Sequence, residues 1–262
     1  NELRNNMFIG VNMLKNFFDK FSEEVVFIIL LVLLLITMFF RMPDTKSIDW
    51  AVIAALFNLM LVAIAFEYEN FLDYIALSVV KRFHTEKKLT IAMIFTSIFI
   101  SMFMTNDVAL LTLVPITILI GKKGKFNPFK IVAFETTAAN LGSSLTPFGN
   151  PQNIFIFNYF KLETLSFLKV TFPFVLIAII SMLIFSNFMS KEKIEFEISE
   201  VEIKSKNRVA IYGILFIIAI LSIVHILSYV IVTPIIAISF ILMNKKLILN
   251  VDYFLLGTFV LF

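Results

Sequence analysis

Long apolar runs alternate with short polar segments along most of the chain. Only two of the apolar runs reach the roughly 20 residues that cross about 30 Å of hydrocarbon, and several others reach that length with their semi-polar flanks. This pattern predicts an all-α, polytopic membrane protein. The apolar runs lie at residues 25–40, 50–66, 91–104, 108–120, 169–189, 209–227 and 230–243.

The polar triplet Thr-Asn-Asp at 105–107 interrupts one of these apolar regions. The arms on either side, 91–104 and 108–120, have 13–14 residues each, or about 20 Å of helix. Such short arms with a polar tip are typical of discontinuous membrane segments. We therefore expect a re-entrant helical hairpin over 91–120, the alternative being two ordinary spans joined by a short outside turn.

A second interruption, at 142–152, holds two of the seven Gly and two of the seven Pro in the chain. Regular helix is disfavoured there, so we expect a helix from near Pro128 to about Leu141, an unwound centre, and a further helical piece. The expected unit is a broken transmembrane helix over 128–160. Unwound backbone at membrane depth is tolerated only where it lines a cavity or is buried in protein. The alternative, a surface loop, would leave two stranded half spans.

Charge placement predicts the topology. Of the 22 Lys and Arg residues, 18 fall in one alternating set of loops and 4 in the other, so the first set is expected to face the cytoplasm by the positive-inside rule. The N-terminus is then cytoplasmic, in a multi-pass protein of the cell (inner) membrane. The positive set is 1–24, 67–90, 121–130, 190–208 and 244–250, and the other set is 41–49 and 161–169.

Composition narrows the function classes. Hydrophobic residues make up 60% of the 262 positions, and Cys is absent, which excludes thiol catalysis, iron–sulfur clusters and thiolate zinc sites. His84 and His225 are the only histidines, and we interpret His225 as interfacial in preference to a proton relay. We expect no enzyme, no cofactor and no nucleic-acid partner, but a lipid environment and a small-molecule or ion substrate.

A weak internal repeat suggests the domain organisation. The stretch at 47–59 matches 250–262, with Asp49 opposite Asp252, and the two helices are expected to begin on opposite sides of the membrane, as in inverted repeats. A second hairpin and broken helix would then follow Phe262, so we expect a truncated portion of a longer transporter. The expected parts are an interfacial helix at 1–24, a first transmembrane repeat at 25–189, a cytoplasmic linker at 190–208 and the start of a second repeat at 209–262.

Several polar residues have simple interpretations. Glu135 is as consistent with an ion pair to Lys130 as with a proton relay. Asn58 is expected to make a hydrogen bond between helices, and Glu67 and Glu69 are expected to snorkel from a helix end.

The stretches "SMFMTNDVALLTLVP" (101–115) and "AANLGSSLTPFGNPQN" (138–153) resemble the ion transporter superfamily, which includes citrate and dicarboxylate transporters, arsenite permeases and a class of sodium/proton antiporters. The resemblance covers most of the chain as a first repeat. It implies a hairpin tip and an unwound helix that together bind substrate and coupling ion. The implied cation-binding residues are Ser101, Thr105, Asn106 and Gly149, with Na⁺ at the last three, and the substrate-binding residues are Asn106, Asp107, Thr146, Asn150 and Pro151.

Asp107 departs from the dicarboxylate branch, which usually has Thr at this place, and is similar to the arsenite permease branch. An intramembrane carboxylate costs about 2.5–3.5 kcal/mol on insertion scales and is a functional-site hypothesis. Unless protonated or paired with a cation it repels an anionic substrate. Asp107 therefore favours proton coupling, or a neutral or inorganic substrate, over a sodium-coupled dicarboxylate.

The residue types at the two interruptions predict one site that can bind a cation and an anion together. Hydroxyl, amide and freed carbonyl oxygens suit hard cations such as Na⁺; Ser143 and Ser144 are among the expected donors. The helices that follow, expected to begin at Val108 and near Asn153, would direct positive dipole ends at an anion.

We therefore expect a secondary active transporter, an H⁺- or Na⁺-coupled permease for an anion or small oxyacid of the citrate/dicarboxylate or arsenite class. It would work by alternating access, with a homodimer plausible from its exposed scaffold face. The alternatives are a Na⁺/H⁺ antiporter, with Asp107 exchanging the ions, and a channel, which the single Asn150–Pro151 motif supports poorly.

Overall fold

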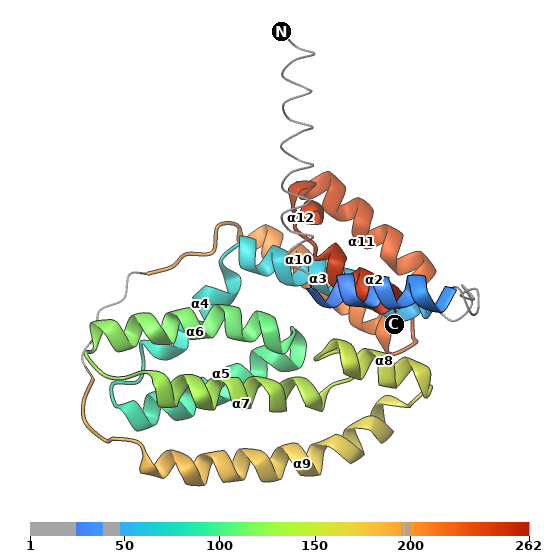
Figure 1. Ribbon diagram of the computed structural model, residues 1–262. Helices are drawn as coiled ribbons and strands as arrows, with labels where there is room; N and C mark the ends of the chain where they lie inside the picture. The colour runs from blue at the N-terminus through green and yellow to red at the C-terminus, as the bar shows by residue number, and fades with distance from the viewer. Residues whose placement is uncertain (1–24, 39–47, 195, 197–199, 262) are drawn as a thin grey trace. The chain divides into compact units, whose positions relative to one another are not determined.

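The computed structural model describes residues 25–38, 48–194, 196 and 200–261, and these are helical except for connecting segments and one isolated bridge between Thr85 and Lys193. The expected interfacial helix at 1–24 lies outside the described residues. The described residues form two compact units, one that includes residues 25–38, 48–53 and 252–261 and one that includes the described part of 54–251. The helices are α2 (Val25–Met38), α3 (Trp50–Tyr68), α4 (Phe71–Val80), α5 (Glu86–Phe103), α6 (Asn106–Lys123), α7 (Phe129–Leu145), α8 (Pro151–Tyr159), α9 (Thr164–Phe185), η2 (Ser186–Phe188), α10 (Lys206–Ile223), α11 (Tyr229–Asn244), α12 (Lys246–Leu249) and α13 (Tyr253–Leu261) (Figure 1).

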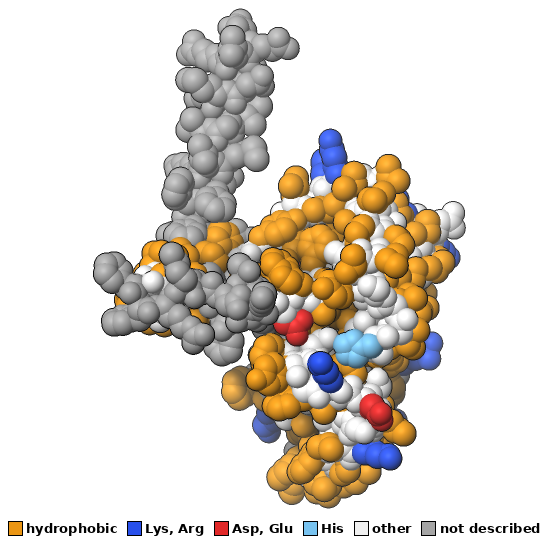
Figure 2. Space-filling view, turned by 90° about the vertical axis from the view of Figure 1, so that its right-hand side faces the viewer, with side chains coloured by type: hydrophobic (Ala, Val, Ile, Leu, Met, Phe, Trp, Pro, Cys, Tyr) orange, Lys and Arg blue, Asp and Glu red, His pale blue; other side chains and the backbone are white. Residues whose placement is uncertain are grey.

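Three described helical segments are long and apolar enough to cross a membrane: Trp50–Tyr68, Thr164–Phe188 and Lys206–Ile223. Large apolar side chains on the second of these, including Phe174 and Ile177, are exposed. Hydrophobic side chains cover much of the face in Figure 2. An apolar surface of this extent suits contact with lipid. The expectation of an all-α polytopic membrane protein is thus supported at the level of helix length and surface.

The hairpin arms, α5 and α6, contact each other, and both pack against α7 (Figure 1). The chain leaves helical geometry between them at Met104 and Thr105 only. Each arm has 18 residues, about 27 Å of helix, so the expected arm length of 13–14 residues is wrong. Thr85 caps α5 by accepting a hydrogen bond from the Lys88 amide, 3.4 Å away, which starts that helix earlier than the apolar run. The break is present, and re-entry into the membrane stays a prediction.

The second interruption also separates two helices, but the break is shorter than expected. The first helix, α7, follows Pro128 as anticipated and continues to Leu145, so only residues 146–150 are non-helical before α8 begins. Gly142 remains in the helix and packs directly on α5. A Cβ there would overlap the Ser101 hydroxyl and lie 2.5 Å from the Ile98 carbonyl oxygen. This glycine provides close helix packing and not an unwound backbone.

The segment between η2 and α10 is non-helical where described and is held by backbone hydrogen bonds. The Ile194 amide donates to the His84 carbonyl at 2.8 Å, and the Lys87 amide donates to the Ser190 carbonyl at 2.9 Å. Ile194 is buried. The beginning of the expected linker, up to Ile194, is therefore fixed against the connection between α4 and α5.

Candidate functional site

The two helix breaks touch each other. The Thr146 hydroxyl, in the second break, donates a hydrogen bond of 2.7 Å to the backbone carbonyl of Met102, in the last turn of α5. The Thr171 hydroxyl of α9 donates to the Leu145 carbonyl at 3.3 Å. These carbonyls lie at helix C-terminal ends, where backbone acceptors lack intrahelical partners. Side-chain hydroxyls thus satisfy both helix ends and join them to neighbouring elements.

Beside this contact, two amides join the tip of the hairpin to α7. The Asn106 side-chain NH₂ lies 3.4 Å from the Asn140 Oδ1, and the Asn140 NH₂ donates to the Thr136 carbonyl at 2.8 Å. Sequence reasoning missed Asn140. An amide within an apolar stretch that precedes a break is the signal that could have identified it.

Both helices that follow the breaks begin with a capped N-terminus. Thr105 Oγ1 accepts from the Val108 amide at 3.3 Å, and Asn150 Oδ1 accepts from the Asn153 amide at 2.8 Å. The helices begin two residues earlier than expected, α6 at Asn106 and α8 at Pro151, because these side chains serve as N-caps and proline suits the first helical position.

Asp107 lies in the first turn of α6 and is exposed. A carboxylate there is favoured by the helix dipole, so helix stabilisation accounts for part of its presence. The N-terminal ends of α6 and α8 carry the positive ends of their helix dipoles, which favour a nearby negative charge.

The second break is folded tightly on the end of α7. A Cβ at Gly149 would overlap the backbone carbonyl of Ser143. The Asn153 NH₂ donates to the Ser143 carbonyl at 3.0 Å and to the Thr146 carbonyl at 2.9 Å, and the Asn150 NH₂ lies 3.4 Å from Ser143 Oγ. Asn153, also missed by sequence reasoning, therefore occupies carbonyls that the helix end leaves free.

Ser143 and Ser144 lie in the last turn of α7, where an unwound backbone was expected. Both hydroxyls donate to the Asn140 carbonyl, at 3.0 Å and 2.7 Å, so they belong to the helix and not to an unwound segment. Ser101 Oγ similarly donates to the Ile98 carbonyl at 3.1 Å and is buried.

The structure brings together part of the expected site. Ser101 lies against Gly142, and Thr146 bonds to the neighbouring Met102. Among the described residues, no hydrogen bond joins 105–107 to 149–151. The Thr146–Met102 hydrogen bond is therefore the direct link between the two breaks.

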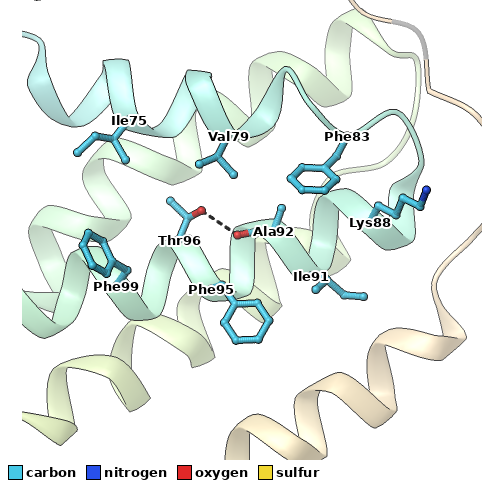
Figure 3. A pocket seen from close by; sticks show the side chains of 9 residues that line it. All are labelled: Ile75, Val79, Phe83, Lys88, Ile91, Ala92, Phe95, Thr96 and Phe99. Carbon is cyan, nitrogen blue, oxygen red and sulfur yellow. Dashed lines mark hydrogen bonds between the residues drawn. The ribbon is translucent and has the colours of Figure 1, made fainter.

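A cavity of about 530 Å³ lies elsewhere, between α4 and α5 (Figure 3). Its walls are formed by apolar side chains such as Val79, Ile91 and Phe95, and Lys88 lies at one end. The one hydroxyl there, on Thr96, donates to the Ala92 carbonyl at 2.8 Å. None of the expected site residues lines this cavity, which lacks the polar oxygens expected of an ion or oxyacid site.

Two buried polar residues on the helices have partners on other helices. The Asn58 NH₂ donates to Thr233 Oγ1 at 3.0 Å, which confirms the expected hydrogen bond between helices. Glu135 is fully buried and hydrogen-bonded to the Thr117 hydroxyl. The expected pair with Lys130 is wrong, because Lys130 lies on the exposed side of α7 and a separation of five residues places two side chains on different helix faces.

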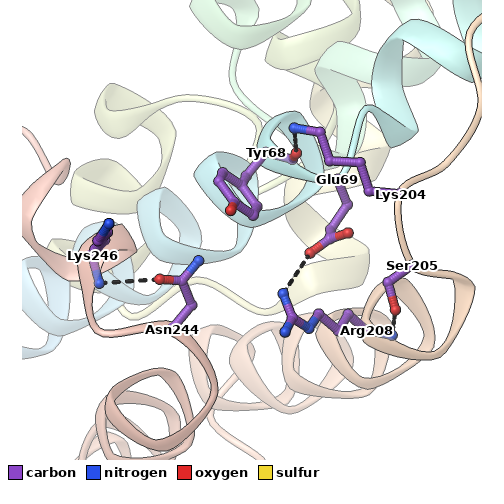
Figure 4. Close-up of polar contacts among 7 residues, drawn as sticks. All are labelled: Tyr68, Glu69, Lys204, Ser205, Arg208, Asn244 and Lys246. Atoms are coloured by element: carbon purple, nitrogen blue, oxygen red, sulfur yellow. Dashed lines mark hydrogen bonds and ion pairs between the residues drawn. The ribbon is translucent and has the colours of Figure 1, made fainter.

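Glu69 also differs from its expected role. Its side chain is buried and lies 3.5 Å from the guanidinium of Arg208 (Figure 4), whereas Glu67 is exposed. Snorkelling is therefore wrong for Glu69. His225 is exposed, with its ring stacked on Phe157 at a centroid distance of 5.5 Å.

The sequence matches one family model and several known proteins. The family model described as "Citrate transporter" matches residues 16–261. An uncharacterized transporter of Methanocaldococcus jannaschii is 35% identical over 234 residues, or 88% of this chain and 63% of the relative. The inner membrane protein YbiR of Escherichia coli is 38% identical over 48% of this chain and 34% of its own length. A transporter named arsB, of Dictyostelium discoideum, is 29% identical over 45% of this chain and 23% of its own length.

The chain thus spans less than two thirds of the length of each of these relatives. The region matched by the family model nevertheless includes both helix breaks and all of the described helices. The chain belongs to the citrate transporter family, a family of membrane transporters.

Proposed function

We propose that the chain is part of a secondary active, ion-coupled permease for an anion or small oxyacid of the citrate/dicarboxylate or arsenite class. The contact between the two helix breaks through Thr146 and Met102 carries this proposal. It links the end of α5 to the segment that follows α7. The next helices, α6 and α8, have N-termini capped by the side chains of Thr105 and Asn150. Alternating access follows if the hairpin and broken helix move together relative to the remaining helices.

The proposed ligands combine hydroxyl, amide and backbone oxygens, which suit Na⁺, with helix N-termini, which suit an anion. Asp107 adds a carboxylate beside the same N-terminus, and an anionic substrate requires that carboxylate to be neutralised by a proton or a cation. Coupling between ion and substrate follows from this charge balance. The proposed cation ligands are Ser101, Thr105, Asn106 and Gly149, and the proposed substrate ligands are Asn106, Asp107, Thr146, Asn150 and Pro151.

The second candidate function is Na⁺/H⁺ antiport. The exposed carboxylate of Asp107 at the start of α6 favours it, because one acid group that binds either ion suffices for exchange. Asp107→Asn separates the two functions, since antiport requires the acid whereas an anion binds more readily without the negative charge.

The decisive experiment is uptake of labelled citrate and of arsenite by the complete native protein in proteoliposomes with imposed Na⁺ or H⁺ gradients. For the permease, Asp107→Asn retains uptake with an altered pH dependence. The exposed carboxylate Glu163 provides the control Glu163→Gln, which leaves uptake unchanged. Loss of Na⁺-driven proton movement in Asp107→Asn, together with no anion uptake by the wild type, would replace the permease with the antiporter.

We also propose that the N-terminus and the loop after α6 face the cytoplasm, which the distribution of positive charge supports. These 262 residues contain no Cys, so a single cysteine introduced here reports its own location once any Cys elsewhere in the complete protein is replaced by Ser. The exposed residues Lys122 and Glu163 are suitable positions. In intact cells, an impermeant thiol reagent should label Glu163→Cys and spare Lys122→Cys; the reverse pattern inverts the topology.

A further inference from the structure

The buried carboxyl of Glu135 lies between α6 and α7, away from both helix breaks. Glu135 and Thr117 are both 0% exposed, and one carboxyl oxygen of Glu135 is hydrogen-bonded to the Thr117 hydroxyl. The other oxygen, Oε2, has no hydrogen-bond partner among the described residues. A buried acid with one satisfied oxygen requires an explanation.

An ionised carboxylate has about four acceptor positions, and a single neutral hydroxyl satisfies only one of them. A buried, uncompensated charge is strongly disfavoured, and such groups neutralise. The protonated acid has no such difficulty, because its O–H can donate to the Thr117 oxygen and only a neutral oxygen is left unpaired. We propose that Glu135 is a proton-binding site of this transporter, loaded in the conformation seen here.

The charged residues on the helices that pack against α7 lie mostly near the ends of those helices; on α6, Lys122 follows Thr117 by five residues, or about 7.5 Å of helix. None of them forms an ion pair with Glu135 among the described residues. The proton itself therefore provides the charge neutralisation. The charged residues are Glu86, Lys87 and Lys88 on α5, Asp107, Lys122 and Lys123 on α6, and Lys169 on α9.

The proton site is evenly spaced from the two breaks. Thr117 lies eleven residues after Asn106, which begins α6, and Glu135 lies eleven residues before Thr146, which follows α7. Each separation corresponds to about 16 Å of helix. The proton site thus lies between the proposed substrate site and the opposite ends of the same two helices, which carry Lys122 and Lys130.

This placement provides a route for coupling. Release of the proton leaves a carboxylate and a free H⁺, and the carboxylate then requires water or further donors that the closed contact between α6 and α7 does not supply. Deprotonation therefore favours an opened contact between these helices. Because α6 begins at the first break and α7 ends at the second, proton occupancy affects how the two breaks meet. The coupling step rests on the proposed function, whereas the bound proton does not.

The bound proton can be tested without a substrate. Infrared spectra of the complete native protein in lipid, in H₂O and D₂O at neutral pH, should contain a protonated carboxylic C=O band that is absent from Glu135→Gln and retained by Glu163→Gln. Thr117→Val should keep the band at a shifted frequency, because it removes the hydrogen bond and keeps the acid. An identical band in wild type and Glu135→Gln overturns the proposal, as does a band that disappears on adding Na⁺ at constant pH.

The coupling step is tested by citrate transport. Glu135→Gln, which imitates the protonated acid permanently, should lose proton-driven net uptake and keep citrate–citrate exchange, with Glu163→Gln unchanged in both. Wild-type pH dependence of uptake in Glu135→Gln refutes coupling through this residue. Absence of citrate uptake by the wild type counts against the proposed substrate, and the infrared result still decides whether Glu135 binds a proton.

Discussion

The Thr146 hydroxyl donates a 2.7 Å hydrogen bond to the backbone carbonyl of Met102, 44 residues earlier in the chain. This bond connects two places where helices end, so one hydroxyl adds a polar link to the packing of α5 on α7. Its consequences can be measured separately from transport.

Thr146→Val removes the hydroxyl and keeps the branched shape of the side chain. The Met102 carbonyl loses this partner, and an unsatisfied buried acceptor costs about 1–3 kcal/mol. We expect a lower thermal unfolding midpoint in detergent and reduced uptake in liposomes. The control is Thr137→Val, because Thr137 is exposed and its hydroxyl donates only within α7, to Ala133. Equal effects of the two substitutions would show that the link between the breaks contributes nothing.

Gly142→Ala introduces a methyl group where α7 packs tightly on α5. The new Cβ would overlap Ser101 Oγ and lie 2.5 Å from the Ile98 carbonyl oxygen, so the helices must separate. We expect destabilisation of about 1–3 kcal/mol and loss of transport.

A matched control exists for this glycine. Gly213 is also helical, in α10, and a Cβ there meets nothing within 4 Å. Gly213→Ala should be neutral or stabilising by up to about 1 kcal/mol, because alanine has the higher helix propensity. A Gly142→Ala protein as stable as Gly213→Ala would contradict the described packing of α5 on α7.

Arg208→Gln should destabilise the protein because it leaves the Glu69 carboxylate buried without its ion-pair partner. The pair is separated by 3.5 Å, with side-chain exposures of 46% for Arg208 and 1% for Glu69. We expect the free energy of unfolding to fall by about 1–3 kcal/mol. This is less than the cost of breaking a fully buried ion pair, because water reaches the arginine. Adding Glu69→Gln to this variant should restore part of the lost stability. Chemical denaturation of the wild type, the two single variants and the double variant measures the interaction energy between the two side chains. Additive losses would show that the pair does not interact.

Asn58→Leu and Thr233→Val both remove the 3.0 Å hydrogen bond between α3 and α11. Hydrogen bonds between membrane helices contribute about 0.6 kcal/mol on average and up to about 1.7 kcal/mol. The double variant should lose less stability than the sum of the single ones, as measured by unfolding in mixed micelles. Thr233→Val alone should cost more than the bond itself, because Asn58 Oδ1 already has no partner among the described residues.

The sequence predicted both helix breaks because each depends on local chemistry. Polar Thr105 stops an apolar helix by capping the next one, and the Pro and Gly residues of 146–150 disfavour regular helix. The break boundaries were less predictable. Gly142 was assigned to an unwound segment, but its role depends on Ser101 and Ile98 of a different helix, and no local pattern reveals that.

The partners of the two buried acids were not predicted, for the same reason. Glu69 contacts Arg208 and Glu135 contacts Thr117, and in both cases tertiary packing brings residues of different helices together. Local reasoning left Glu135 open between an ion pair with Lys130 and a proton relay, and placed Glu69 at the membrane surface. The prediction for Asn58 was correct because an isolated amide on an apolar helix needs a hydrogen-bond partner, whichever helix supplies it.

The N-caps of α6 and α8 have a consequence for a transporter whose substrate site is empty. Under the proposed function, a symporter must reorient with its site empty, and bare amides facing a dry cavity would oppose that step. Thr105 and Asn150 already occupy the Val108 and Asn153 amides, so ligand release does not expose these donors. We therefore expect Thr105→Val to slow net efflux, which needs the unloaded return, more than exchange, which bypasses it. Equal slowing of both would show that the caps serve helix formation alone.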